Sequence, residues 1–113
     1  MPWVPSLEAH SSPQPAKLER MARYTINHFR RLVRNLDYFV SSHAAEELED
    51  DGLSVLDLES IVLSGDVVER QRDTRKNETK FVIAGTTLNG TAAEVVVKVG
   101  FTGKLIVITA YVC

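Results

Sequence analysis

The sequence lacks most of the patterns that mark an enzyme or a metal site. Its single cysteine, Cys113, is the last residue, which excludes an internal disulfide framework and a cysteine-rich zinc site. It contains no Gly-rich phosphate loop, no His-Glu-x-x-His motif and no serine-nucleophile elbow. The three histidines, His10, His28 and His43, are too scattered to indicate a metal. We therefore expect no metal and no other cofactor.

Long apolar runs are also missing, and this limits where the protein can act. No run approaches membrane-spanning length, and the N-terminus has no basic-then-apolar signal pattern. Together with the lack of disulfides, this predicts a cytoplasmic protein without a membrane partner. All four prolines fall in residues 1–15, which predicts a disordered N-terminal tail. The remaining residues, 16–113, suit a single domain.

Positive charge is absent from the middle of the chain. Residues 46–66 contain eight acidic residues and no Lys or Arg, whereas residues 1–45 and 67–113 each have a local charge of +3. The net charge of −2 therefore hides a basic–acidic–basic layout. This layout is typical of a helix pair with a solvated acidic face, and it also suits a protein that meets an anionic partner on one side.

Residues 16–36 show the spacing of an amphipathic helix. Three interpretations remain open for it: a helix packed on the core, a phosphate-contacting helix, or an apolar stripe that pairs with another chain. The basic face carries Lys17, Arg20, Arg23, Arg30, Arg31 and Arg34. The apolar stripe consists of Leu18, Met21, Ala22, Phe29, Leu32, Val33 and Leu36.

The stretch from residue 38 to residue 65 is predicted to hold a short strand followed by two helices. The strand covers 38–40, and a helix-prone segment after it stops at Gly52. Ser54 starts the second helix, with Asp57 three residues later as an acidic variant of the capping box. Gly65 stands where a left-handed C-cap would end this helix.

After residue 66 the pattern changes from helical spacing to strands. Strands are predicted at 67–72, 80–87, 92–99 and 105–112, with a polar loop over 73–79. Asn89-Gly90 predicts a type I′ hairpin turn, and residues 100–103 predict a second tight connection. The sequence therefore predicts an α+β fold, with N-terminal helices packed on an antiparallel meander of about four strands.

A loose set of side chains could support metal-independent RNA cleavage. Such cleavage needs a base, an acid for the leaving oxygen and cations near the phosphorane. His43, Tyr111 and Thr109 are the candidates for the catalytic roles. A histidine at a strand–helix junction is more often a capping residue, and Tyr111 near a strand end is more often core or rim. The candidates for RNA binding are Arg70, Arg72, Arg75, Lys80 and Lys98.

The run from His43 to Ser54, HAAEELEDDGLS, resembles the HAxxRMxERGIS signature of domain-of-unknown-function family 4258. The segment with Asp57, Ile61, Leu63, Gly65, Asp66, Val67 and Val68 is similar to the family's next motif, and Ile108-Thr109-Ala110-Tyr111 to its closing one. The resemblance covers about residues 38–112. It implies the fold of RelE/barnase-like toxin ribonucleases, metal-independent endoribonuclease activity and an antitoxin partner. The residues of this chain that match the family's motifs, and to which the resemblance assigns the catalytic roles, are His43, Thr109 and Tyr111.

The chain departs from this signature at three charged positions. Glu47 and Asp51 stand where the signature has arginines, and Glu94 stands where the family often has a histidine. Carboxylates beside a phosphate would repel it by about 1 kcal/mol each at exposed separations. The arginines of the signature are therefore either structural and replaceable here, or this chain has lost the nuclease chemistry.

Three function hypotheses follow. The first is a degenerate toxin-like endoribonuclease that binds RNA. The second is a non-catalytic protein-interaction module, which would bind an antitoxin or form a homodimer through the 16–36 helix or a sheet edge. The third is a small-ligand pocket in which the acidic run over residues 46–51 selects a cation.

Overall fold

The computed structural model describes residues 15–113, and its side chains from Arg20 onward. The predicted tail therefore lies outside the described residues, apart from Pro15, at which the first helix begins. The helices are α2 (Pro15–Arg34), α3 (Ser42–Asp50) and α4 (Val55–Ser64). The strands are β1 (Tyr38–Val40), β2 (Asp66–Asp73), β3 (Glu78–Thr86), β4 (Ala92–Val99) and β5 (Leu105–Val112).

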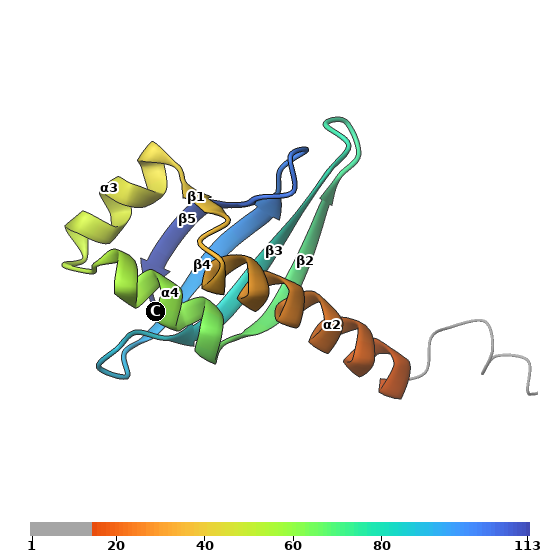
Figure 1. Ribbon diagram of the computed structural model, residues 1–113, viewed down its shortest axis with the longest axis horizontal. Helices are drawn as coiled ribbons and strands as arrows, with labels where there is room; N and C mark the ends of the chain where they lie inside the picture. Colours follow the sequence, from red (N-terminus) through yellow and green to blue (C-terminus); the bar gives the residue numbers. More distant parts are fainter. Residues whose placement is uncertain (1–14) are drawn as a thin grey trace, which may run out of the picture.

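The five strands form one mixed sheet in the order β1-β5-β4-β3-β2. Strands β2 to β5 make an antiparallel meander, and β1 adds to it in parallel with β5. Helices α2 and α4 cross one face of this sheet, and α3 lies beside β5 (Figure 1). The predicted α+β fold is confirmed, and the short strand at residues 38–40 is its fifth, parallel member.

The core lies between the helices and the face of the sheet that they cover. Alternate residues of β4, Ala93, Val95 and Val97, are buried there, as the period-2 alternation of a strand requires. They pack in one cluster with the buried residues of the helices, among them Phe29 and Ile61. The sheet therefore uses one face for the core, and none of the three described helices covers the other face.

Helix α2 buries only part of its apolar stripe. Ile26, Phe29 and Val33 are buried. The Phe29 and Phe81 rings pack edge to face, with their centroids 5.2 Å apart. Met21 is 50% exposed, and the N-terminal part of α2 extends beyond the sheet (Figure 1). The core-packed interpretation of α2 therefore holds from Ile26 onward.

Helix α4 begins as its sequence predicts and ends differently. Ser54 accepts a hydrogen bond from the backbone N–H of Asp57, whose carboxylate accepts one from the Ser54 N–H in return. The predicted left-handed C-cap is wrong, because Gly65 has φ −95° and ψ 179°. Gly65 is required for another reason: a Cβ there would lie 2.5 Å from the Ile61 carbonyl oxygen and 2.6 Å from that of Ala84.

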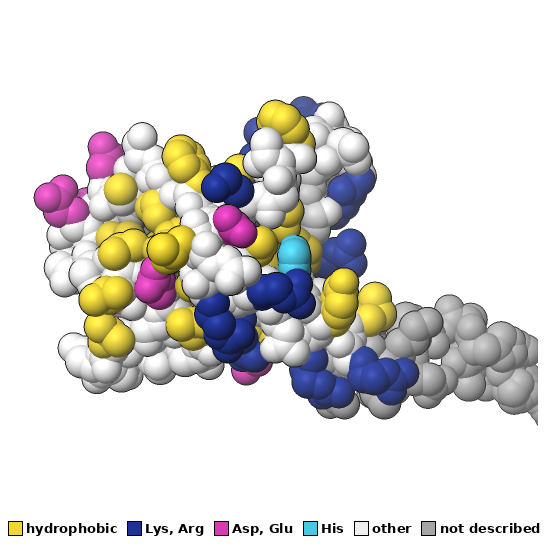
Figure 2. All heavy atoms as spheres, viewed as in Figure 1, with side chains coloured by type: hydrophobic (Ala, Val, Ile, Leu, Met, Phe, Trp, Pro, Cys, Tyr) yellow, Lys and Arg dark blue, Asp and Glu magenta, His cyan; other side chains and the backbone are white. Residues whose placement is uncertain are grey.

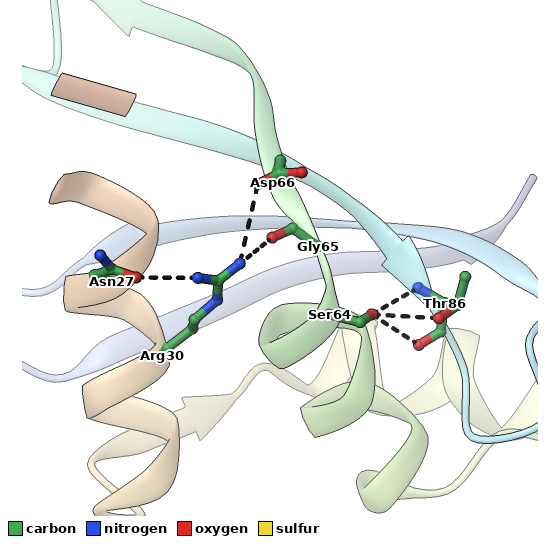
Figure 3. A network of polar contacts seen from close by, with 6 residues as sticks. All are labelled: Asn27, Arg30, Ser64, Gly65, Asp66 and Thr86. Carbon is green, nitrogen blue, oxygen red and sulfur yellow. Dashed lines mark hydrogen bonds and ion pairs between the residues drawn. The ribbon is translucent and has the colours of Figure 1, made fainter. Parts of the chain in front are cut away.

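Arg30 fixes α2 against the end of α4 (Figure 3). Its Nη2 donates to the Gly65 carbonyl at 2.9 Å and lies 3.9 Å from the Asp66 carboxylate, while Nη1 donates to Asn27 at 3.0 Å. Ser64, on the other side of the same junction, bonds the backbone of Thr86. The orientation of α2 is therefore set by specific polar contacts as well as by the core.

The β3–β4 turn also differs from its prediction. Gly90 has φ +88°, but Asn89 does not have the positive φ that a type I′ turn needs. Thr87 N–H donates to the Thr91 carbonyl at 2.9 Å, which closes a loop of three residues. The Asn89 side chain accepts hydrogen bonds from Thr87 and Thr91 and so holds this wider loop.

None of the helices within residues 15–113 combines the length and apolar composition needed to cross a bilayer.

Candidate functional site

His43 lies on the exposed side of the first turn of α3. The helix is capped by Ser41, whose hydroxyl accepts from the Ala44 N–H and donates to the Ile108 carbonyl of β5. The His43 side chain is 66% exposed, and its Nε2 lies 3.4 Å from the Glu47 carboxylate. The imidazole is thus in solvent, and its charged neighbour one turn later is an acid.

Glu47 and Asp51 accept hydrogen bonds from the backbone of β5 beyond the end of β1. Strand β1 ends beside Val107, so no strand within residues 15–113 pairs with the next part of the β5 edge. The Ala110 N–H donates to Glu47 Oε1 at 2.9 Å, and the Val112 N–H donates to Asp51 Oδ2 at 3.3 Å. Arginine has no acceptor atom and could not make these bonds. The two acids therefore cap a sheet edge.

This capping gives a stability prediction for Glu47. Glu47→Ala should lower the free energy of unfolding by about 1–2 kcal/mol, because it leaves the Ala110 N–H without its acceptor in a half-buried place. Glu47→Gln keeps an acceptor oxygen and should cost less than half as much. Urea denaturation of the two variants measures the difference. Equal losses would show that the carboxylate is not a backbone cap.

Tyr111 lies on β5 directly opposite Glu94 of β4. Its hydroxyl donates to Glu94 Oε1 at 2.5 Å. That hydrogen bond, followed by burial and the Glu94 charge, raises the pKa of Tyr111 to about 12. The phenol is therefore neutral at physiological pH, and its proton is held by a carboxylate.

The phenols give a second prediction, at alkaline pH. Burial and a hydrogen bond to Glu59 likewise raise the pKa of Tyr38 to about 12. Both hydroxyls should therefore ionise near pH 12, and Glu94→Ala should move the Tyr111 titration back toward 10.0. Because each folded pKa is raised, the associated stability is complete below about pH 10 and is lost as pH rises to 12. In a Tyr24→Phe background, which removes the third tyrosine, absorbance at 295 nm follows both ionisations. A single Glu94-independent transition near pH 10 would contradict the assignment.

The structure connects His43 and Tyr111 only indirectly. Glu47 contacts the His43 ring and the Ala110 N–H, and Ala110 precedes Tyr111. Each of the two candidates has a carboxylate as its charged neighbour, Glu47 for the imidazole and Glu94 for the phenol. Thr109, the third candidate, is half-buried on β5 opposite Val96.

The candidate RNA-binding residues lie at the other end of the sheet. Lys98 pairs in register with Ile106 near the β4–β5 turn, whereas Glu94 pairs with Tyr111 near the chain end. The two positions are four residues apart along β4, which is about 13 Å along a strand. Lys80 and Arg72 lie beside the β2–β3 turn. The register therefore separates the cations from the phenol.

A groove of about 710 Å³ runs between the β2–β3 and β4–β5 turns. Arg72 donates to Thr79 at 3.0 Å and to Asn77 at 2.7 Å, which holds its guanidinium at the groove. Phe101 is fully exposed on the rim. We call this the hairpin groove; its lining consists of Arg72, Lys76, Asn77, Glu78, Thr79, Phe81, Lys98, Val99, Gly100, Phe101 and Ile106.

A second groove of about 540 Å³ shares Arg72 and adds Arg75 and Lys80. Five cations and two acids line the two grooves together, a local charge of +3. The acids are Asp73 and Glu78, and Glu78 is paired with Lys98 at 3.1 Å. Arg70, the remaining RNA-binding candidate, is exposed on β2 opposite Phe81 but does not line either groove.

Sequence reasoning missed two groove residues, Lys76 and Phe101. Lys76 falls in the polar 73–79 loop, where a charged residue is expected and carries little information. Phe101 could have been found, because an aromatic side chain in the tight Gly-Phe-Thr-Gly connection has no strand or helix neighbour to cover it. Its full exposure is the informative observation.

The basic and acidic blocks of the sequence lie on different sides of the molecule. On the face in Figure 2, Lys and Arg side chains gather over α2 and the β2–β3 hairpin, whereas the α3 side shows Asp and Glu. The described residues contain no group of three or more His, Cys, Asp or Glu side chains placed to hold a metal ion. The acidic run thus forms no such cation site within them.

A family model described as "Domain of unknown function (DUF4258)" matches residues 40–112. The chain belongs to this family. The DUF4258 match begins at the last residue of β1 and includes α3, α4 and the whole meander, while α2 precedes it. Comparisons with curated proteins and with solved structures give no significant match. Both His43 and the hairpin groove lie within the DUF4258 region.

Proposed function

We propose that this DUF4258 protein binds single-stranded RNA in the hairpin groove and does not cleave it. The proposal rests on one observation: the same groove is lined by Arg72, Lys76 and the exposed Phe101 ring. Proteins bind single strands without sequence preference by combining cations for the phosphates with aromatic faces on which bases stack. The resemblance to toxin ribonucleases expected from the sequence would imply the same ligand, and it stays a prediction.

The surrounding charge favours an anionic ligand at this end of the molecule. The two neighbouring grooves have a local charge of +3, although the whole chain has −2. The acidic residues of α3 lie on the other side of the molecule, over β5 (Figure 1). An RNA strand approaching the β2–β3 hairpin therefore meets cations first, and its affinity will depend strongly on salt.

Cleavage is left out of the proposal because of where the acid–base candidates lie. A general base must come within about 3 Å of the proton that it removes. The Tyr111 proton is already donated to Glu94, and His43 faces Glu47. A phosphate brought to either group would meet a carboxylate, and the phenol is about 13 Å along the sheet from Lys98.

The test is a paired binding and cleavage assay. Fluorescently labelled 12-nucleotide single-stranded RNA is incubated in 50 mM salt with wild type and with His43→Ala, and is followed by anisotropy and by gel. We expect saturable binding by both proteins and intact RNA with both. Cleavage by wild type that His43→Ala abolishes would overturn the non-catalytic part. The absence of any binding would overturn the RNA assignment.

Protein binding is a second candidate function, because the chain exposes an apolar groove far from the hairpin. Leu56 and Leu88 are 57% and 66% exposed, and both line a groove between α4 and the β3–β4 loop. An antitoxin partner, which the family resemblance implies, could occupy such a groove. It remains a prediction of that resemblance.

A further inference from the structure

The apolar groove on α4 is not covered by any segment within residues 15–113. It has a volume of about 400 Å³ and is lined by Leu56, Leu63 and Leu88, with Glu59 at its side. The buried face of α4, with Ile61 and Val62, points to the sheet, so these leucines are not part of the hydrophobic core. We call this surface the α4 groove. A cluster of three partly exposed leucines is the composition expected of an interaction surface.

The first described turns of α2 form a complementary knob. Met21 and Tyr24 of α2 are 50% and 75% exposed, and the N-terminal part of this helix extends beyond the sheet (Figure 1). They adjoin Arg20 and Arg23, and α2 from Arg20 to Arg34 contains five arginines and no acid. We call Arg20, Met21, Arg23 and Tyr24 the α2 knob. It combines an aromatic ring, a flexible apolar side chain and positive charge.

The two surfaces have opposite charge. Residues 54–66, which include α4, hold three acids, Asp57, Glu59 and Asp66, and no Lys or Arg, and Glu59 lines the α4 groove directly. An apolar groove with an acidic side fits an apolar segment with basic flanks. Opposite charges attract across such an interface, whereas two acidic or two basic surfaces would repel each other. The α2 knob is such a segment, and it is present in every copy of the chain.

The knob cannot reach the α4 groove of its own chain. Arg30 anchors α2 to the C-terminal end of α4 through the Gly65 carbonyl (Figure 3). Met21 lies nine residues before Arg30 on the same helix, which places it about 13 Å from Arg30 along the helix axis, toward the N-terminal end of α2. Only another molecule can bring a knob to this groove.

We propose that a second copy of this chain seats its α2 knob in the α4 groove, and that the exchange is reciprocal. A two-fold pair then makes the same contact twice, and it closes without exposing a further knob or groove. The inference is independent of RNA binding, because neither surface includes a residue of the hairpin groove. It gives a specific form to the expectation of a homodimer through α2.

Sedimentation equilibrium of the full chain from 1 to 200 μM tests the proposal. Wild type should associate to a dimer, and Tyr24→Ser or Leu88→Ser should each weaken the association at least about tenfold, since each removes an anchor from both contacts. Raising the salt from 50 to 500 mM should also weaken it. Both side chains are largely exposed, so both variants should fold. Phe39→Ala is the control, because Phe39 is a 60% exposed aromatic residue outside both surfaces.

Mixing the two variants gives the decisive outcome. The Leu88→Ser copy has an intact knob and the Tyr24→Ser copy has an intact groove, so the mixture regains one of the two contacts. We expect the mixture to associate more strongly than either variant alone. A monomer at every wild-type concentration would overturn the proposal. So would association that the substitutions leave unchanged, or a mixture that behaves like the separate variants.

Discussion

Gly85→Ala should destabilise the protein by about 3 kcal/mol or more, a large part of the 5–15 kcal/mol typical of such a domain. A Cβ at Gly85 would lie 2.2 Å from the backbone carbonyl oxygen of Ile61 on α4. It would also come within 3.0 Å of the Gly65 Cα. Backbone atoms cannot move away as the end of a side chain can, so α4 would have to separate from β3.

Gly100→Ala is the matched control for this prediction. A Cβ there would lie 2.9 Å from Ile106 Cδ1, the flexible end of a side chain that can rotate aside. Its cost should therefore be about 1 kcal/mol or less. Urea denaturation of both variants, fitted with a common slope, gives the comparison. If the two substitutions cost the same, the close contact between α4 and β3 is not what stabilises the fold.

Arg72→Ala with Lys76→Ala should weaken RNA binding by roughly 30-fold at 50 mM salt. Each lost cation–phosphate contact is worth about 1 kcal/mol at exposed separations. Four groove cations have no carboxylate partner in the structure: Arg72, Arg75, Lys76 and Lys80. With four phosphate contacts the salt slope is about −2.8, so wild-type affinity should fall about 50-fold between 50 and 200 mM salt.

The double variant should also change the salt slope. Removing two of the four contacts should make it shallower by about 1.4. Arg31→Ala with Arg34→Ala removes the same charge from α2, away from the groove, and should change affinity less than about threefold. Anisotropy titrations at several salt concentrations measure both quantities. Equal effects of the two double variants would show that net charge, and not the hairpin groove, determines binding.

The sequence predicted those parts of the fold that depend on neighbours along the chain. The Ser54–Asp57 capping box and the strand alternation of β4 need only local spacing, and both are present. Gly65 was misread because the reason for its glycine is tertiary: the carbonyl oxygens of Ile61 and Ala84 converge on it. A close approach between α4 and β3 leaves no local pattern.

The cations of the proposed RNA site were named from the sequence, but their arrangement was not. Arg72 and Lys98 do reach one groove, but their distance from Tyr111 follows from the strand register, which composition does not reveal. The backbone-capping role of Glu47 was also hidden, because it depends on where β1 stops along β5. Charge reversal at that position is visible in the sequence, but its structural cause is not.

The RNA-binding surface can be mapped residue by residue with NMR. Backbone amide resonances of ¹⁵N-labelled protein are followed during titration with the 12-nucleotide single-stranded RNA in 50 mM salt. We predict that chemical-shift changes concentrate in residues 71–80 and 98–102, around Arg72 and Phe101, while the resonances of residues 43–51 and 109–112 stay unchanged. Shifts centred on His43 and Tyr111, with the hairpin residues unaffected, would contradict it.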